Sequence, residues 1–175
     1  KYGLNNGYLN QNDFTDGDLI LYDSPTLNEL KKSKIKGKYF FSYFKKWTPQ
    51  ENFYYCTENT GFKTNSERTE GTYSKYASLD DKFDGFHYYL RYIKFGLGRC
   101  VEDVSHEIRD KHITREEGLA LVKKYEGEFP KKYYKEFLQY LDISDKQFWK
   151  IVDSWRPKHL WKKEGKKWKL KFPPK

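Results

Sequence analysis

The hydrophobic residues of this chain are mostly aromatic, and this restricts the kind of core that it can build. Tyr, Phe and Trp make up 19% of the 175 residues, and all hydrophobic types together make up only 37%. Aliphatic side chains are so few that the sequence lies just above the level at which a charged chain stays disordered. Each aromatic side chain can bury roughly 150 to 250 Å². The sequence therefore predicts one compact domain, or a large piece of one, with an aromatic core.

Apolar residues at helical spacing predict a mainly α-helical array. Phe86, Tyr89, Leu90 and Ile93 follow the i, i+3, i+4, i+7 pattern, which predicts a helix over about 82–95. Similar stripes or helix-start signals predict further helices, which begin near residues 25, 49, 101, 114, 133 and 144. Three of these starts are capping boxes, at Thr48, Thr114 and Ser144.

The N-terminal third is expected to contain loops and the only strand. Residues 1–24 are rich in Asn, Asp and Gly and predict a loop, whereas the aromatic residues 38–44 predict a short β-strand. Residues 61–78 are polar and unperiodic. They predict a long loop, and long ordered loops often have a function. The expected fold is thus a helical array with a short β-strand and long loops in the N-terminal third.

Positive charge is concentrated at the C-terminus. The formal net charge is +9, and residues 158–175 contain eight Lys and one Glu. The remaining chain is nearly neutral, which argues against a nucleic-acid-binding face. A small basic nucleic-acid-binding helical module remains the alternative function, with a helix-turn-helix within residues 114–155 and the lysine tail as an arm. The connection over 126–132 is long for the turn of that motif.

Few features indicate a metal site or a membrane segment. Cys56 and Cys100 lie far apart without a second pair, which argues against a disulfide scaffold or a zinc ribbon. The histidines lack the spacing of metal ligands, so we expect no metal bound by this chain. No apolar run approaches the ~20 residues that span a bilayer. We expect a cytoplasmic protein without membrane insertion.

Ionisable side chains on one face of the predicted 82–95 helix form a first candidate site. They recur at i, i+3, i+7 and i+10: Asp84, His87, Arg91 and Lys94. The helix leads into Gly96 and Gly98, which allow close backbone approach at the start of the next helix, beside Arg99. This pattern predicts a nest for phosphate or carboxylate. A solvated helix face and an ordinary helix-helix turn explain the same residues.

The loop that precedes this helix forms a second candidate site. It places five charged side chains close together in the sequence: Lys75, Asp80, Asp81, Lys82 and Asp84. Carboxylates are suitable ligands for Mg²⁺, and lysines for a polyphosphate. A loop that is held together by its own ion pairs has the same composition.

Three ordered stretches resemble one known family. They are residues 70–89 (EGTYSKYASLDDKFDGFHYY), residues 92–99 (YIKFGLGR), and EIR at 107–109 with HITREEG at 112–118. Similar sequences occur in the C-terminal half of the N-acetyl sugar amidotransferases. The similarity extends from about residue 40 to residue 161, and includes PQEN at 49–52, GEFP at 127–130 and PKHLW at 157–161.

The resemblance implies the C-terminal part of an α/β PP-loop enzyme of bacterial surface-polysaccharide and flagellar-glycan sugar biosynthesis. Such enzymes convert a sugar acetamido group to an acetamidino group, and glutaminase and cyclase-like partner subunits supply the ammonia. The amide oxygen attacks the α-phosphate of ATP, and ammonia then displaces AMP. The resemblance therefore implies ATP and Mg²⁺ as cofactors of the full-length enzyme, and a nucleotide-linked N-acetyl sugar as its substrate.

This sequence departs from the family in the part that binds the nucleotide. It contains no Ser-Gly-Gly-x-Asp-Ser loop and no N-terminal cysteine pairs. We therefore expect a chain that is inactive alone and binds no ATP tightly. Its expected parts are the end of a nucleotide-binding domain with a connector (1–47), a helical C-terminal domain (48–161) and a basic tail (162–175).

The resemblance and the helix pattern together define the candidate residues. Lys94 and Arg99 are expected to be catalytic. Contacts with sugar, phosphate or the ammonia donor are expected from Lys75, Asp80, Asp81, Lys82, Asp84, His87, Arg91, Gly96, Gly98, Arg115 and Glu116. Arg115 and Glu116 are equally explained as surface residues in the first turn of a capped helix.

Overall fold

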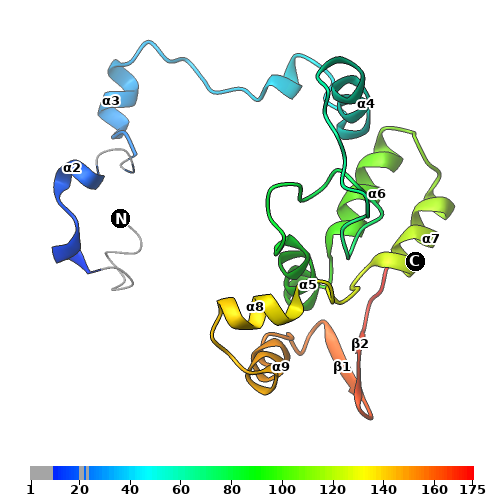
Figure 1. The fold of residues 1–175 in the computed structure, drawn as a ribbon. Helices are drawn as coiled ribbons and strands as arrows, with labels where there is room; N and C mark the ends of the chain where they lie inside the picture. Colours follow the sequence, from blue (N-terminus) through cyan, green and yellow to red (C-terminus); the bar gives the residue numbers. More distant parts are fainter. Residues whose placement is uncertain (1–9, 20–21, 23) are drawn as a thin grey trace. The chain divides into compact units, whose positions relative to one another are not determined.

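The computed structural model describes residues 10–19, 22 and 24–175 (Figure 1). The chain divides into two units, and the boundary along the sequence lies between Lys46 and Trp47. The first unit contains short helical segments. They are η1 (Gln11–Asp13), α2 (Asp16–Leu19), α3 (Leu27–Lys32) and η3 (Phe41–Tyr43). Residues 10–19, expected as a loop, thus contain two short turns, and the rest of the expected 1–24 loop lies partly outside the described residues.

Two boundaries in the first unit differ from the sequence prediction. The helix expected from Ser24 begins after Thr26, whose side chain accepts a hydrogen bond from Glu29 N in a complete capping box. The strand expected over 38–44 is wrong, because a 3-10 turn occupies Phe41–Tyr43. Its aromatic side chains are exposed, and no neighbouring strand pairs with it among the described residues.

The second unit is a helical array that ends in a β-hairpin. Its elements are α4 (Pro49–Asn59), α5 (Asp84–Phe95), α6 (Arg99–Arg109), α7 (Arg115–Tyr125), α8 (Tyr134–Tyr140), α9 (Asp145–Ser154), β1 (Trp161–Glu164) and β2 (Lys167–Leu170). The mainly helical fold class is confirmed. The strands lie at the C-terminus, where the sequence predicted none.

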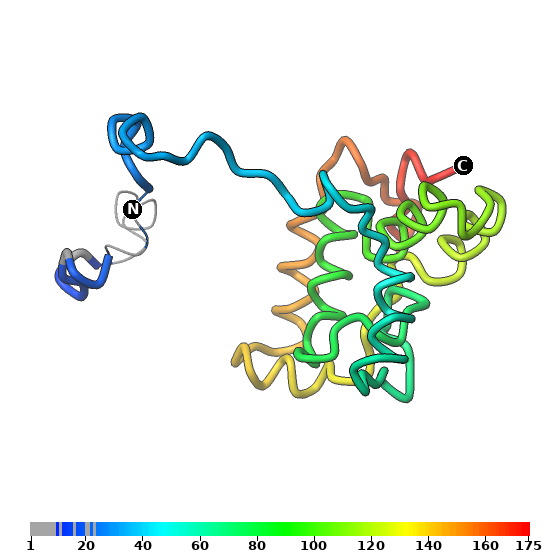
Figure 2. Tube along the Cα trace, turned by 90° about the horizontal axis from the view of Figure 1, so that it is seen from above, coloured from blue at the N-terminus to red at the C-terminus, as the bar shows by residue number. Residues whose placement is uncertain are grey.

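The larger of two core clusters forms between α5 and α9, which run side by side in Figure 2. Tyr89 and Ile93 of the predicted α5 stripe pack against Phe148 and Val152 of α9. Phe86 adds a stacked contact with Phe137 of α8, with ring centroids 3.9 Å apart. The core is therefore built largely from aromatic rings, as the composition predicts.

A second, smaller cluster joins α6 to α7 through Cys100, Val104 and Val122. A Cβ atom on Gly118 would lie 2.6 Å from the Val104 side chain, so only glycine allows this close approach of the two helices. Gly96 has φ 71° and ends α5 in the left-handed conformation, which turns the chain directly into α6.

The hairpin is attached to the first core cluster. Trp161 pairs with Leu170 in the antiparallel register, and Trp168 and Leu170 pack against the buried residues. The buried Trp161 indole donates a hydrogen bond of 2.8 Å to Ile93 O in α5. The C-terminal lysines therefore project from a docked hairpin.

The long loop expected over 61–78 is present and extends to residue 83 without a helix or a strand. In the part of the chain that the structure describes, we find no helix with the length and apolar character to cross a bilayer.

Candidate functional site

A cleft of about 930 Å³ lies between the long loop and the segment that joins α7 to α8. Residues 65–70, Lys75, Asp81 and Lys82 line one wall, Glu128 and residues 130–133 line the other, and Gly85 and Phe86 of α5 complete the lining. This volume is at the upper end of the range of small-molecule sites, roughly 300 to 1,000 Å³.

An ion pair between the two walls fixes the shape of the cleft. The Arg68 guanidinium donates to both carboxylate oxygens of Glu128, over 2.6 and 2.8 Å. It also donates to Thr72 O and lies over the Tyr125 ring, 4.5 Å from its centroid. The hydrogen bond from Arg68 holds the pKa of the Glu128 carboxyl below its usual value. Glu128 accepts a further bond from Gly71 N.

A second set of contacts joins the same walls. The Glu70 carboxylate accepts hydrogen bonds from Lys131 N and Lys132 N, over 2.8 and 3.2 Å. The Lys132 ammonium lies 3.4 Å from a Glu67 carboxylate oxygen. These acidic groups are thus used to hold the walls together.

Three of the expected residues line this cleft, and they have different partners. The Lys82 ammonium pairs with Glu136 of α8, and Asp81 accepts a hydrogen bond of 2.7 Å from Phe83 N. The ammonium groups of Lys75 and, on the opposite wall, Lys131 form no ion pair within the described residues. The cleft therefore presents two cations that remain available for an anionic ligand.

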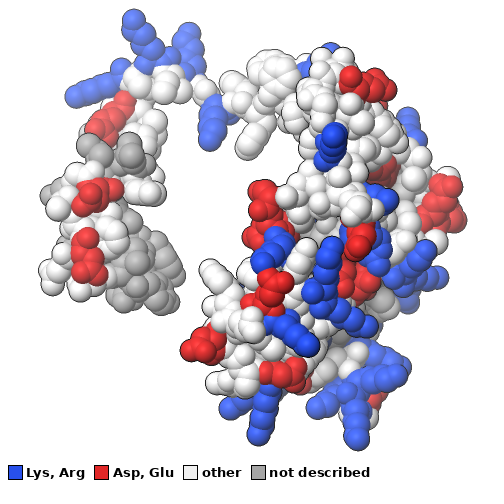
Figure 3. Space-filling view, in the orientation of Figure 1, with Lys and Arg blue, Asp and Glu red and all other residues white. Residues whose placement is uncertain are grey.

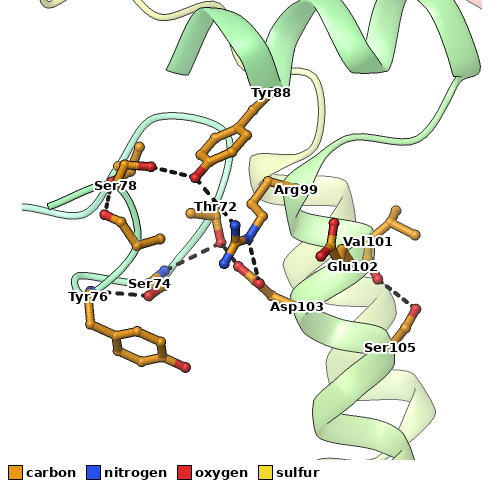
Figure 4. A network of polar contacts seen from close by, with 12 residues as sticks. Thr72, Ser74, Tyr76, Ser78, Tyr88, Arg99, Val101, Glu102, Asp103 and Ser105 are labelled. Atoms are coloured by element: carbon orange, nitrogen blue, oxygen red, sulfur yellow. Dashed lines mark hydrogen bonds and ion pairs between the residues drawn. The ribbon is translucent and has the colours of Figure 1, made fainter. Parts of the chain in front are cut away.

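Arg99 belongs to a polar network that holds the long loop against α5 and α6 (Figure 4). Its side chain donates to Asp103 over 2.7 Å and to the Tyr88 hydroxyl over 3.3 Å. Tyr88 also bonds to Ser78, and Asp103 accepts a hydrogen bond of 2.5 Å from the fully buried Thr72. In this arrangement Arg99 positions the loop that lines the cleft, in contrast to the expected catalytic contact.

The anion nest expected at Gly96 and Gly98 is already filled by the protein itself. Gly98 N donates to the Glu126 carboxylate, and so does Val101 N, over 3.1 Å. Burial raises the pKa of the Glu126 carboxyl. Because this side chain satisfies the free N–H groups at the start of α6, we no longer expect phosphate binding there.

The other expected site residues have partners of their own or lie away from the cleft. Arg91 pairs with Glu102, and the Lys94 ammonium lies over the Trp155 ring, 5.2 Å from its centroid. Arg115 donates to the carbonyl of Lys175. The remaining candidates lie outside the lining of the cleft: Asp80, Asp84, His87 and Glu116.

The residues present do not form a metal or thiol site. No group of three or more His, Cys, Asp or Glu side chains within residues 10–19, 22 and 24–175 is arranged to hold a metal ion. Asp80, Asp81 and Asp84 belong to no such group. Burial raises the pKa of the Cys100 thiol to about 12, which keeps this group protonated and unreactive.

Residues 70–172 match a family model, which is described as the C-terminal domain of WbpG-like LPS biosynthesis proteins. The chain belongs to this family. The match includes α5 to α9, the hairpin and most of the cleft lining in the WbpG-like domain. No curated protein gives a significant match to the chain. The family assigns a role in LPS biosynthesis, and confirms that the sequence resembles part of a sugar-biosynthesis enzyme.

Sequence reasoning missed most of the residues that build the cleft of this WbpG-like domain. Arg68, Lys131 and Lys132 lie outside every helix stripe and local charge pattern, and Glu70 appears only as the first residue of the stretch 70–89 that carries the resemblance. A signal existed for Glu128, because the resemblance includes GEFP at 127–130. The pairing of Arg68 with Glu128 links residues 60 positions apart, so spacing within one element cannot indicate it.

Proposed function

We propose that this WbpG-like domain provides the sugar-binding side of an ATP-dependent N-acetyl sugar amidotransferase. The enzyme would convert an acetamido group to an acetamidino group with glutamine-derived ammonia, in bacterial surface-glycan biosynthesis in the cytoplasm. Family membership supports the biosynthetic pathway class. The resemblance of residues 70–99 to amidotransferases supports the reaction.

The cleft with its two available ammonium groups is the observation on which this proposal depends. Lys75 and Lys131 line the two walls of the cleft, and the acidic residues Glu67, Glu70 and Glu128 of those walls are bound to Lys132, backbone N–H groups and Arg68. A nucleotide-linked sugar contains a diphosphate that such ammonium groups bind by charge-assisted hydrogen bonds. Lys75 and Lys131 would hold the diphosphate, and the loop would orient the sugar.

The proposed reaction requires ATP, and the residues of this chain do not form a complete ATP site by themselves. An amide is a poor electrophile, and ATP supplies the activation by which its oxygen becomes a leaving group. The sequence contains no PP-loop motif, and the described residues include no group of three or more His, Cys, Asp or Glu side chains that could hold a metal ion. We assign no nucleotide step to its residues, and Arg99 acts as a positioning residue. The ammonia would come from glutaminase and cyclase-like partner subunits.

The proposal is tested by calorimetry of the chain with UDP-N-acetylglucosamine as the probe. Lys75→Ala and Lys131→Ala should each weaken binding by roughly 10-fold or more, because a hydrogen bond to a charged group contributes about 1.5–3 kcal/mol. Lys150→Ala, an exposed substitution on α9, is the matched control and should bind normally.

Free N-acetylglucosamine should bind much more weakly, because it lacks the diphosphate. Equal affinity for the two sugars, or for the parent and both cleft variants, would exclude a diphosphate site in this cleft. If the chain bound a generic DNA duplex more tightly than UDP-N-acetylglucosamine, and with a steep dependence on salt concentration, the nucleic-acid-binding alternative would be favoured.

A further inference from the structure

Residues 31–46, here called the basic aromatic segment, combine a strong positive charge with exposed rings. Five lysines lie within residues 31–38 and two more follow at positions 45 and 46, and no acidic residue occurs in the segment. Its five aromatic side chains are between 66% and 80% exposed. In Figure 3, blue side chains project from this part of the first unit and white ones follow.

The local structure keeps the rings together and the lysines on both sides of them. The chain leaves α3 at Lys32 and has no regular structure until the 3-10 turn at Phe41–Tyr43. This turn brings Tyr43 to 5.7 Å from Tyr39 and to 5.1 Å from Phe44, measured between ring centroids. The result is a small exposed ring cluster flanked by lysines.

We propose that the basic aromatic segment binds the surface of a membrane that contains anionic lipids. Near such a surface each lysine strengthens binding by roughly fivefold, and aromatic rings lie favourably among the headgroups. Binding at a membrane surface grows with the apolar area that enters the headgroup layer and with the electrostatic attraction to anionic lipids, and this segment contributes to both. The interaction is independent of the sugar site proposed above.

The shape of the segment favours a lipid surface over a nucleic acid or a protein. Three of the five rings, Tyr39, Tyr43 and Phe44, pack edge-on or tilted against one another, which reduces the separate ring faces on which bases could stack. A protein partner requires a shaped epitope, whereas a fluid headgroup layer adapts to a segment that has no regular structure between α3 and the 3-10 turn.

The experiment is co-sedimentation of the chain with vesicles of equal parts phosphatidylcholine and phosphatidylglycerol, and with phosphatidylcholine alone. The chain should sediment with the anionic vesicles and remain in the supernatant with the neutral ones. The triple substitution of Lys34, Lys36 and Lys38 by Gln should weaken binding by roughly 100-fold. Substitution of Phe40, Phe41 and Phe44 by Ser should also weaken it, by at least tenfold, although the charge is unchanged.

The C-terminal hairpin provides a control with the same change in charge. Lys158, Lys166 and Lys167 are exposed, and residues 158–175 contain one largely exposed ring, Phe172, where the segment has five. Their replacement by Gln should reduce binding far less than the triple substitution in the segment.

Three outcomes with vesicles would overturn the proposal: an equal loss of binding in the hairpin variant, equal binding to both kinds of vesicle, or no effect of the Phe→Ser changes. The proposal would also be overturned if the variant with Gln at positions 34, 36 and 38 lost its affinity for a generic DNA duplex but bound the anionic vesicles as well as the parent does.

Discussion

At the residue scale, the contacts of Arg99 decide between a catalytic and a positioning role. Arg99→Ala removes the cationic partner of Asp103, which keeps its hydrogen bond from Thr72, and a bond to the Tyr88 hydroxyl. Because both groups are partly or fully buried, we expect the free energy of unfolding to fall by about 1–3 kcal/mol in urea denaturation. Arg109→Ala, at an exposed position of α6, should leave it unchanged. Unaltered stability of Arg99→Ala together with lost sugar binding would restore Arg99 as a ligand contact.

A second prediction at this scale concerns acid stability. The pKa of Glu128 is lowered by its hydrogen bond with Arg68, so this carboxylate stabilises the folded state above its ordinary pKa of 4.5. That contribution is lost as the pH falls through the lowered folded-state pKa. In Glu128→Gln, stability should therefore be lower at neutral pH and decline less steeply below pH 4.5, as followed by urea unfolding at several pH values. A Glu128→Gln curve parallel to that of the parent would contradict this role.

At the element scale, the start of α6 depends on a residue from the end of α7. Glu126→Ala leaves Gly98 N and Val101 N without their acceptor, and we expect a loss of about 1–3 kcal/mol in unfolding free energy. Glu126→Gln keeps one acceptor oxygen and should lose less. Hydrogen exchange of the first turn of α6 should accelerate in both variants. Glu116→Ala, in the exposed first turn of α7, serves as the control, and equal exchange in all variants would refute the contact.

Helix starts that depend on neighbouring residues were predictable from the sequence. The capping boxes at Thr114 and Ser144 are confirmed, because each is completed within three residues. Thr48 also begins its helix as predicted, but its hydroxyl bonds to the Glu51 side chain and does not cap a backbone N–H. Sequence spacing fixes the helix in these cases, and side-chain geometry decides the cap.

Features that depend on tertiary contacts were not predictable in the same way. The contact of Glu126 with Gly98 joins residues 28 positions apart, and so a filled helix start had the same sequence pattern as an open anion nest. The strand expected over 38–44 rested on aromatic content alone, and strands form only where a partner backbone is available. Lys75, Asp81 and Lys82 do line the cleft, but its opposite wall comes from another part of the chain.

At the scale of the whole molecule, the hairpin completes the larger core cluster. The sequence predicted a basic tail over 162–175, but Trp168 and Leu170 pack against buried residues of that cluster. Deletion of residues 165–175 should therefore lower the free energy of unfolding by about 2–4 kcal/mol. Deletion of 172–175 alone removes only exposed residues and should change it little. Equal thermal transitions for the parent and both deletions would show that the hairpin is dispensable.

The hydrogen bond from the Trp161 indole to Ile93 O also has a consequence for synthesis of the protein. Translation delivers α6 and α7 one after the other, so their small cluster can form on the nascent chain from neighbouring segments. The apolar face of α5 is covered by α9 and the hairpin, which are synthesised after α6 and α7. Until they are available, Tyr89 and Ile93 of the nascent chain face solvent, and this stretch is a candidate for chaperone binding.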